Sequence, residues 1–255
     1  MNSPREEWHF DTTRIGRRVL VFDEVESTNS VAATFSDPEH NGLVIVARNQ
    51  TAGRGQHGRS WESRPGSSLL MSVVLHPPPE LRRAAILTAW AAVALGDAVF
   101  SLTSSQAKIK WPNDLLVRGK KVCGILIEQA AATVVGIGLN LNQTTDEFAD
   151  AALPDATSLL VISGKITELR TAVETVVAAL DAEYRRLLWG ECIAVEADWK
   201  WRMGLLGRMV TVERTDGSVI RGRLREMTFD GLELELETGS VHIIVPETVA
   251  HVWTN

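Results

Sequence analysis

The chain has 255 residues, of which 45% are hydrophobic and 23% are charged, so its composition is that of an ordinary globular protein and excludes a disordered or collagen-like chain. Its 2 cysteines, Cys123 and Cys192, form no C-x-x-C pair, which excludes a disulfide framework and indicates reduced thiols in a cytoplasmic protein. The 26 Lys and Arg residues against 32 Asp and Glu residues give a net charge of −6, which disfavours nucleic acid as a partner unless positive charge gathers in one place.

The N-terminal segment, residues 1–16, is polar and aperiodic, and we expect a flexible leader there without a signal peptide. The longest helix-like uncharged run, residues 84–96, falls short of the ~20 apolar residues that span a bilayer. We therefore expect a protein that enters no membrane.

Apolar runs and helical periodicity predict strands and helices up to residue 188. We expect strands at residues 17–22, 43–47, 69–75, 108–111, 115–117, 122–127 and 133–141. A short helix is expected to follow the capping residues Ser27-Thr28-Asn29 and to end at Phe35. Two longer helices are expected at residues 80–100 and 166–188, each with its apolar stripe on one face.

The C-terminal segment has a different sequence pattern, in which short apolar runs alternate with turns at Asp216-Gly217-Ser218, Asp230-Gly231 and Thr238-Gly239-Ser240. About fifty residues of this kind predict a small β-barrel. We expect the boundary before it to lie between Asp198 and Leu205.

The segment Gly53 to Ser60 satisfies G-x-G-x-x-G and nearly satisfies the P-loop pattern, with Arg59 in place of lysine. A strand rather than a helix is expected to follow, so a Rossmann or P-loop site is excluded by context. The spaced glycines still allow backbone N–H groups to converge on an anion. Four arginines, Arg48, Arg54, Arg59 and Arg64, gather around this loop, which favours a small anionic ligand over an ordinary surface loop.

A second candidate segment is Lys110-Trp111-Pro112-Asn113-Asp114, in which Pro112 stiffens a bend after a strand. A carboxylate and an amide next to a phosphate site suit Mg²⁺, although such a pair alone is more often a charged turn. With a hairpin turn at Arg118 to Lys121, Asp114 is expected opposite Gly124 or Ile125, with Lys121 nearby.

The segment Gly136 to Asn142 has two glycines within a strand and ends in amides. The glycines allow a ligand to approach the backbone, and the amides suit a purine edge. A β-bulge explains the same glycines equally well.

Together these segments resemble the biotin protein ligase family. The matching strings are Ser27-Thr28-Asn29, Gln50 to Trp61, Lys110 to Asp114, Lys121 to Leu126 and Gly136 to Asn140, in the order of the family. The likeness extends from about Val19 to Asn142 and is specific as a set.

The resemblance implies an α+β fold, with a mixed-sheet catalytic domain like that of biotin and lipoate ligases at residues 17–203 and a small SH3-like β-barrel at residues 204–255. It implies that biotin and ATP form biotinyl-5′-AMP and pyrophosphate. Biotin then passes to a specific lysine of the biotin carboxyl carrier domain of a biotin-dependent carboxylase. ATP is the expected co-substrate and Mg²⁺ the expected metal, and a homodimer is left open.

The same resemblance implies the residues of the site. Biotin is expected to contact Ser27, Thr28, Asn29, Gln50, Gly53, Arg54, Gly55, Gln56, Lys121 and Gly124. ATP is expected to contact Arg54, Arg59, Asn113 and Asn140, with Mg²⁺ on Asp114, and the catalytic charges are expected on Arg54, Lys110 and Lys121. Joining a carboxylate to a phosphate requires cations rather than a protein nucleophile, so neither Cys123 nor His57 is expected to be catalytic.

Two other functions stay open on the sequence. A lipoate or octanoate ligase shares this type of catalytic domain, although the tryptophan-containing string Lys110 to Asp114 argues against it. A non-enzymatic nucleotide-binding module would use the glycine loop alone. Family members that also repress transcription carry an N-terminal winged helix, whereas here about sixteen residues precede the first expected strand, so we expect a monofunctional ligase without DNA binding. Gln56 stands where many members have arginine.

Overall fold

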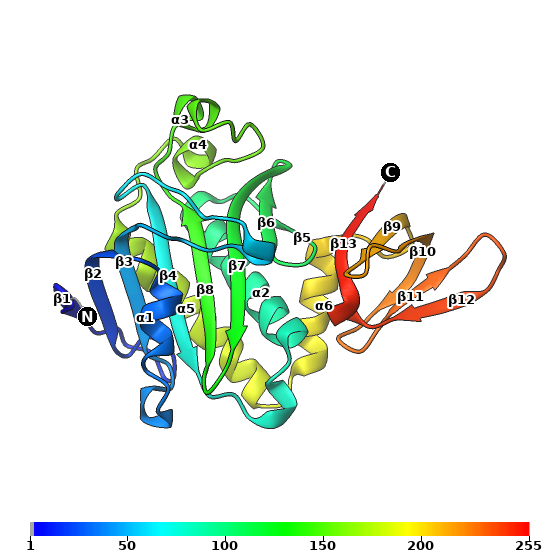
Figure 1. The fold of residues 1–255 in the computed structure, drawn as a ribbon, viewed down its shortest axis with the longest axis horizontal. Coiled ribbons are helices and arrows are strands. Elements are labelled where there is room, and N and C mark those ends of the chain that lie inside the picture. Colours follow the sequence, from blue (N-terminus) through cyan, green and yellow to red (C-terminus); the bar gives the residue numbers. More distant parts are fainter. Residues whose placement is uncertain (1–2, 255) are drawn as a thin grey trace.

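Two β-sheets organise the chain, of which the computed structural model describes residues 3–254 (Figure 1). The larger sheet has the strand order β1-β2-β3-β4-β8-β7-β6-β5. Its strands are β1 (Glu6–Trp8), β2 (Val19–Val25), β3 (Val44–Gln50), β4 (Ser68–Leu75), β5 (Lys108–Lys110), β6 (Asp114–Val117), β7 (Lys120–Gln129) and β8 (Thr133–Asn140). The β2–β3 pair is parallel and the other neighbours are antiparallel, so the sheet is mixed and the expected α+β class is confirmed.

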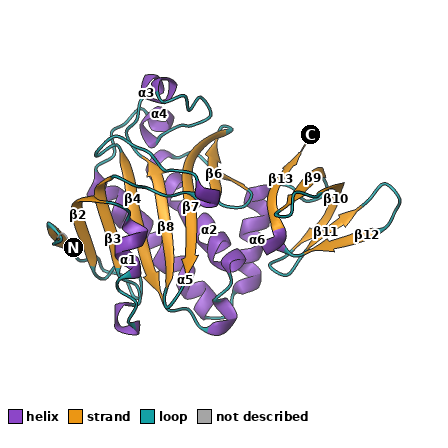
Figure 2. Cartoon of the chain, viewed as in Figure 1, coloured by secondary structure: helices purple, strands orange, loops and turns teal. Residues whose placement is uncertain are grey.

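Helices cover the two faces of this sheet unequally (Figure 2). The short helix α1 (Thr28–Ala33) packs on β3, β4 and β8 from one face. On the opposite face lie α2 (Ala84–Thr103) and α5 (Leu169–Leu188), with α6 (Cys192–Met203) beside them. The small helices α3 (Thr145–Asp150) and α4 (Leu159–Ser163) lie at one end of the sheet. Because helices pack on both faces, the central strands are apolar on both sides and read as continuous hydrophobic runs.

Helix α2 differs from its prediction, because it is buried nearly all round rather than along one stripe. It starts at Ala84, after a 3₁₀ turn η3 (Pro79–Leu81), and continues to Thr103. Its 20 residues are long and apolar enough to cross a membrane, but 72% of the apolar window is buried inside the protein. Contacts with the sheet, α5 and α6 account for this burial, and mark it as a core helix.

The N-terminal segment is not the flexible leader expected from its polarity. Strand β1 pairs with β2, and the side chains of Trp8 and Ile15 are buried in the main core. The buried carboxylate of Asp181 on α5 accepts backbone N–H bonds from Thr13, Arg14 and Ile15, at 2.6 to 3.0 Å. This contact joins positions more than 160 residues apart in sequence, which is why the local pattern did not reveal it.

The smaller sheet has the order β12-β11-β10-β9-β13 and is antiparallel, as the C-terminal turns predicted. Its strands are β9 (Met209–Arg214), β10 (Val219–Met227), β11 (Leu232–Glu235), β12 (Val241–Ile244) and β13 (Val249–Thr254), with a 3₁₀ turn η4 (Pro246–Thr248) before β13. The predicted boundary at residues 198–205 begins inside α6, which the sequence analysis did not anticipate. The chain leaves this helix at Gly204, in a left-handed conformation with φ of 61°.

Candidate functional site

An open pocket lies on the face of the large sheet that carries α1. Its wall is formed by the start of α1, by residues of strands β3 to β8, by the loop before β4 and by β13 of the small sheet. Among the expected site residues, those that line it are Ser27, Thr28, Asn29, Gln50, Arg54, Gly55, Gln56, Arg59, Lys110, Asn113, Asp114, Lys121 and Gly124. The fold therefore brings together residues that are nearly 100 positions apart in sequence.

One corner of the pocket is a buried hydrogen-bond network where α1 begins. The side-chain oxygen of Gln50, at the end of β3, accepts bonds from the Thr28 backbone N–H at 2.7 Å and the Thr28 hydroxyl at 3.0 Å. Ser27 is the N-cap residue, but its side chain makes no capping bond, contrary to expectation. Thr28 and Asn29 of this segment instead line the pocket and form side-chain hydrogen bonds beside it.

Asn29 is buried, and both ends of its amide bond to protein groups. Its Nδ2 donates to Glu128 Oε2 at 2.6 Å, and its Oδ1 accepts from the Ser72 hydroxyl at 2.6 Å. The expected direct contact of Asn29 with biotin therefore competes with these two bonds. Ser72 and Glu128 belong to none of the motifs, and nothing in their local sequence distinguishes them from ordinary strand residues.

The opposite side of the pocket carries the charges expected from the hairpin. Asp114 pairs with Gly124 in the β6–β7 ladder, as predicted, and Lys121 Nζ lies 2.7 Å from Asp114 Oδ1. The Asn113 amide donates to the Ile125 carbonyl at 2.6 Å, which holds the bend after the cis Trp111–Pro112 bond against β7. A cation and a carboxylate therefore face the pocket in a fixed pair.

The four arginines of the glycine-rich region separate in the structure. Arg54 and Arg59 line the pocket, whereas Arg48 pairs with Glu6 at 2.8 Å and Arg64 pairs with Glu147 at 2.6 Å. The prediction that all four form one anion site is therefore wrong for Arg48 and Arg64. Their acidic partners lie on β1 and α3, which the sequence analysis did not place near this loop.

The loop itself closes on its own backbone. A β-bridge joins Arg54 to Ser60, and the Gly55 N–H donates to the Arg59 carbonyl at 2.7 Å. Only a 3₁₀ turn, η2 (Gln56–Gly58), follows the glycines before β4, so the exclusion of a Rossmann or P-loop site is confirmed. The side chain of His57, expected to be non-catalytic, lies outside the part of the chain that the structure describes.

The glycines of β7 and β8 make room for Trp61, which sequence reasoning left without a role. A Cβ atom on Gly138 would lie 2.4 Å from Trp61 Cε2, and one on Gly124 would lie 3.0 Å from Trp61 Cζ3. Lys121 Nζ lies 5.5 Å from the centre of the same indole. A Cβ atom on Gly136 would lie 2.3 Å from Asn29 Oδ1. Close approach, rather than a bulge, therefore explains these glycines, since β7 and β8 pair without a register shift.

Two expected site residues do not reach the pocket wall. Gly53 is buried, and a Cβ atom there would lie 2.3 Å from the Trp61 carbonyl oxygen, so this glycine serves loop packing. The Asn140 amide donates to the Thr157 carbonyl at 3.0 Å and accepts from Gln143 at 3.1 Å. Asn140 therefore fixes the segment after β8, and its contact with adenine has no support from this arrangement.

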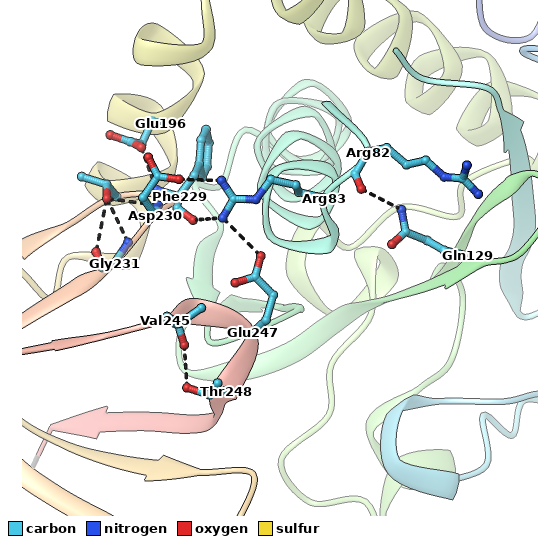
Figure 3. A network of polar contacts seen from close by, with 11 residues as sticks. Arg82, Arg83, Gln129, Glu196, Phe229, Asp230, Gly231, Val245, Glu247 and Thr248 are labelled. Carbon is cyan, nitrogen blue, oxygen red and sulfur yellow. Dashed lines mark hydrogen bonds and ion pairs between the residues drawn. The ribbon is translucent and has the colours of Figure 1, made fainter. Parts of the chain in front are cut away.

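The small sheet also contributes to the pocket, through His251 on β13. Trp111 Nε1 donates to the Val249 carbonyl at 3.1 Å, and the Trp111 ring packs on Trp199, which packs on Phe229. Arg83, just before α2, forms ion pairs with Asp230 at 2.6 Å and with Glu247 at 3.3 Å. Figure 3 shows how its side chain points toward both carboxylates. These contacts hold β13 beside the Lys110–Asp114 segment, which no local pattern predicted.

Cys123 lies beneath the pocket on β7 and is buried. Burial raises the pKa of its thiol, since a thiolate would lose its solvation there, although the nearby Lys121 has the opposite effect. A protonated, inaccessible thiol is a poor nucleophile, in keeping with the expected absence of a catalytic role.

Comparison with known proteins identifies a family over the part of the chain that carries most of the pocket residues. Residues 21–142 match the protein family described as "Biotin/lipoate A/B protein ligase family". The biotin--[acetyl-CoA-carboxylase] ligase of Mycobacterium tuberculosis is 33% identical over 243 residues, covering 90% of this chain and 86% of that protein. The bifunctional ligase/repressor BirA of Bacillus subtilis is 30% identical over 243 residues, covering 91% of this chain and 71% of that protein.

Solved structures show the same likeness. The biotin protein ligase of Aquifex aeolicus, solved in complex with biotin and ATP, superposes with a TM-score of 0.78 at 26% identity, covering 93% of this chain and 99% of that one. Both the Mycobacterium tuberculosis ligase and the Aquifex aeolicus structure match this chain over most of their own length, so the likeness extends across both sheets. The chain belongs to the biotin protein ligase family.

Proposed function

We propose that this chain is an ATP-dependent ligase that activates biotin and transfers it to a lysine of a biotin carboxyl carrier domain. The observation that carries this proposal is the pocket, which the Thr28–Gln50 corner, Arg54 and the Lys121–Asp114 pair line together. The relatives named as biotin ligases, and the relative solved with biotin and ATP, support the same substrates.

The first step joins two anions. A biotin carboxylate oxygen attacks the α-phosphorus of ATP, the bond to the β-phosphate oxygen breaks, and pyrophosphate leaves. Arg54 and Lys121 reduce the repulsion between carboxylate and phosphate, with Lys110 and Arg59 adding positive charge at the rim. In the second step the acceptor lysine amine attacks the biotinyl carbonyl carbon, the C–N bond forms, and AMP leaves as the amine loses a proton.

Mg²⁺ fits this site only together with ATP. No group of three His, Cys, Asp or Glu side chains that could hold a metal occurs among the residues that the structure describes. Asp114 supplies one carboxylate, which suits Mg²⁺ because this ion takes few protein ligands and keeps phosphate and water oxygens. Bound there, the ion would neutralise phosphate charge.

The polar corner favours biotin over a lipoyl or octanoyl group. A ureido ring offers a carbonyl and two N–H groups to Thr28, Gln50 and their neighbours, whereas an alkyl or dithiolane tail offers no strong hydrogen bond. A site built for hydrogen bonds can reject an analogue without them by about 10⁴-fold.

Biotin-dependent exchange of labelled pyrophosphate into ATP tests the proposal. We expect exchange with biotin and none with octanoate or lipoate at equal concentration. Exchange driven by octanoate would favour the related acyl ligase, and no exchange with any of the acids would favour a non-enzymatic nucleotide-binding module. Labelling of a purified carrier domain with biotin, lost when its acceptor lysine is replaced by arginine, tests the transfer step.

A further inference from the structure

Glu128, near the end of β7, connects the start of α1 to the glycine loop. Its carboxylate accepts from Asn29 Nδ2 at 2.6 Å and from Arg54 Nη2, with Arg54 to Oε2 and Oε1 distances of 3.1 and 3.2 Å. Asn29 belongs to the polar corner where α1 begins, and Arg54 opens the glycine loop. One carboxylate thus bonds to both.

The network continues inward from Asn29. Asn29 Oδ1 and Thr28 Oγ1 both lie within hydrogen-bond distance of the Ser72 hydroxyl, at 2.6 and 2.7 Å, and Thr28 bonds to Gln50. A continuous chain of polar contacts therefore runs from Gln50 through Thr28, Ser72, Asn29 and Glu128 to Arg54. Ser72 and Asn29 are buried, so the middle of the chain has little freedom to rearrange.

The Arg54 side chain attaches the glycine loop to α1 and β7. The bridge between Arg54 and Ser60 closes the loop at its base, and the Arg54 side chain then bonds to Ser30 Oγ at 2.8 Å and to Glu128. Within residues 3–254, these bonds use the terminal nitrogens, and no bond is made by the Nε–H. A guanidinium has five N–H groups, so donors remain for an anionic ligand while Glu128 holds the group in place.

Folding stability does not account for the ion pair between Glu128 and Arg54. The side chains of Arg54 and Glu128 are 44% and 41% exposed, and ion pairs with such exposure contribute little to stability. The pair does, however, restrict a long side chain to one orientation at the entrance of the pocket.

We propose that Glu128 is a positioning residue for biotin activation: it acts through Arg54 and holds the base of the glycine loop where the carboxylate and the α-phosphate meet. This inference rests on the proposed function. Because the same carboxylate bonds to Asn29, the position of Arg54 is tied to the corner that receives the biotin ring.

The first test compares Glu128→Ala and Glu128→Gln with the wild-type chain in biotin-dependent pyrophosphate exchange, with kcat and both KM values resolved. Glutamine keeps an acceptor for Asn29 but loses the charge, so Glu128→Gln isolates the contact with Arg54. We expect kcat to fall about tenfold in Glu128→Ala, and less in Glu128→Gln, with a smaller change in the KM for biotin. Asp23→Asn is the matched control, because it removes a carboxylate from an exposed pair with Arg5 outside the pocket. It should leave kcat unchanged.

A double-mutant cycle tests whether Glu128 acts through Arg54. In an Arg54→Ala background, Glu128→Ala should cause no further loss of kcat. A full, independent loss there, or a kcat in Glu128→Ala equal to or above that of the wild type, would overturn the inference. A wild-type chain without biotin-dependent exchange would instead contradict the proposed function.

Limited trypsin digestion of the ligand-free chain gives a readout that does not depend on activity. If Glu128 holds the loop base, Glu128→Ala should be cleaved faster after Arg54 and Arg59, while Asp23→Asn should match the wild type. Equal cleavage rates for Glu128→Ala and the wild type would show that the loop base is held without Glu128.

Discussion

Replacement of Lys121 by alanine separates catalysis from folding in this pocket. Lys121 Nζ lies 2.7 Å from Asp114 Oδ1 and 5.5 Å from the centre of the Trp61 ring, at the rim where the phosphates are proposed to bind. Its side chain is 36% exposed and that of Asp114 is 19% exposed. The lysine is thus accessible to a ligand, and its loss leaves Asp114 in contact with solvent.

The expected stability change is small. A partly exposed ion pair of this kind contributes about 0–1 kcal/mol to the free energy of unfolding, which lowers Tm by no more than about 4 °C in a protein of this size. The expected change in rate is large. Loss of one positioned charge donor lowers the rate of such a step by about 10²–10³-fold, or about 2.7–4 kcal/mol in the activation free energy.

Two measurements on the same preparations test this difference: thermal unfolding, and the initial rate of biotin-dependent pyrophosphate exchange. Lys120→Ala is the matched control, because Lys120 is the exposed neighbour on β7 and does not line the pocket. A folded Lys121→Ala protein with near-wild-type exchange would remove Lys121 from the reaction. An equal loss in Lys120→Ala would show that total charge, rather than the position of Lys121, controls the rate.

Four further outcomes are expected. Gln56→Arg should release biotinyl-adenylate about tenfold more slowly after removal of free ligand, because a charge-assisted bond replaces a neutral one; equal off-rates would assign retention to another part of the pocket. Gly138→Ala should lower the unfolding free energy in urea by about 1–3 kcal/mol, since its Cβ would lie 2.4 Å from Trp61 Cε2, and an unchanged urea midpoint would contradict that packing. Cys123 should resist iodoacetamide at pH 8 until the protein unfolds, with the partly exposed Cys192 as the internal reference, because burial raises the pKa of the Cys123 thiol; rapid labelling of folded protein would refute this. Duplex DNA should not be retained at physiological salt, given the net charge of −6, and salt-sensitive, sequence-specific retention would contradict that expectation.

Local sequence patterns were sufficient for most elements of the large sheet. The apolar runs of β3 and β4, the periodicity of α5 and the hairpin turn at Gly119 each depend on neighbours within a few residues. The hairpin also predicted Asp114 opposite Gly124 or Ile125, and the ladder pairs it with Gly124 after a register shift between Leu115 and Leu116. The family motifs then supplied most residues of the pocket wall, although Gly53 and Asn140 do not line it.

Long-range contacts decided what these patterns left open. The polar residues before β2 were expected to form a flexible leader, but Asp181 accepts hydrogen bonds from their backbone. Arg48 and Arg64 were expected at the anion site, but carboxylates on β1 and α3 bind them. Trp61 and His251 line the pocket, and Glu128 binds Arg54, only because separate strands and the small sheet come together. The sequence by itself determined which segments form strands, helices and motifs, since those depend on local periodicity and turn chemistry. The tertiary structure alone decided that Arg48 and Arg64 leave the pocket while Trp61 and His251 line it, because each of these positions depends on a partner far away in the chain.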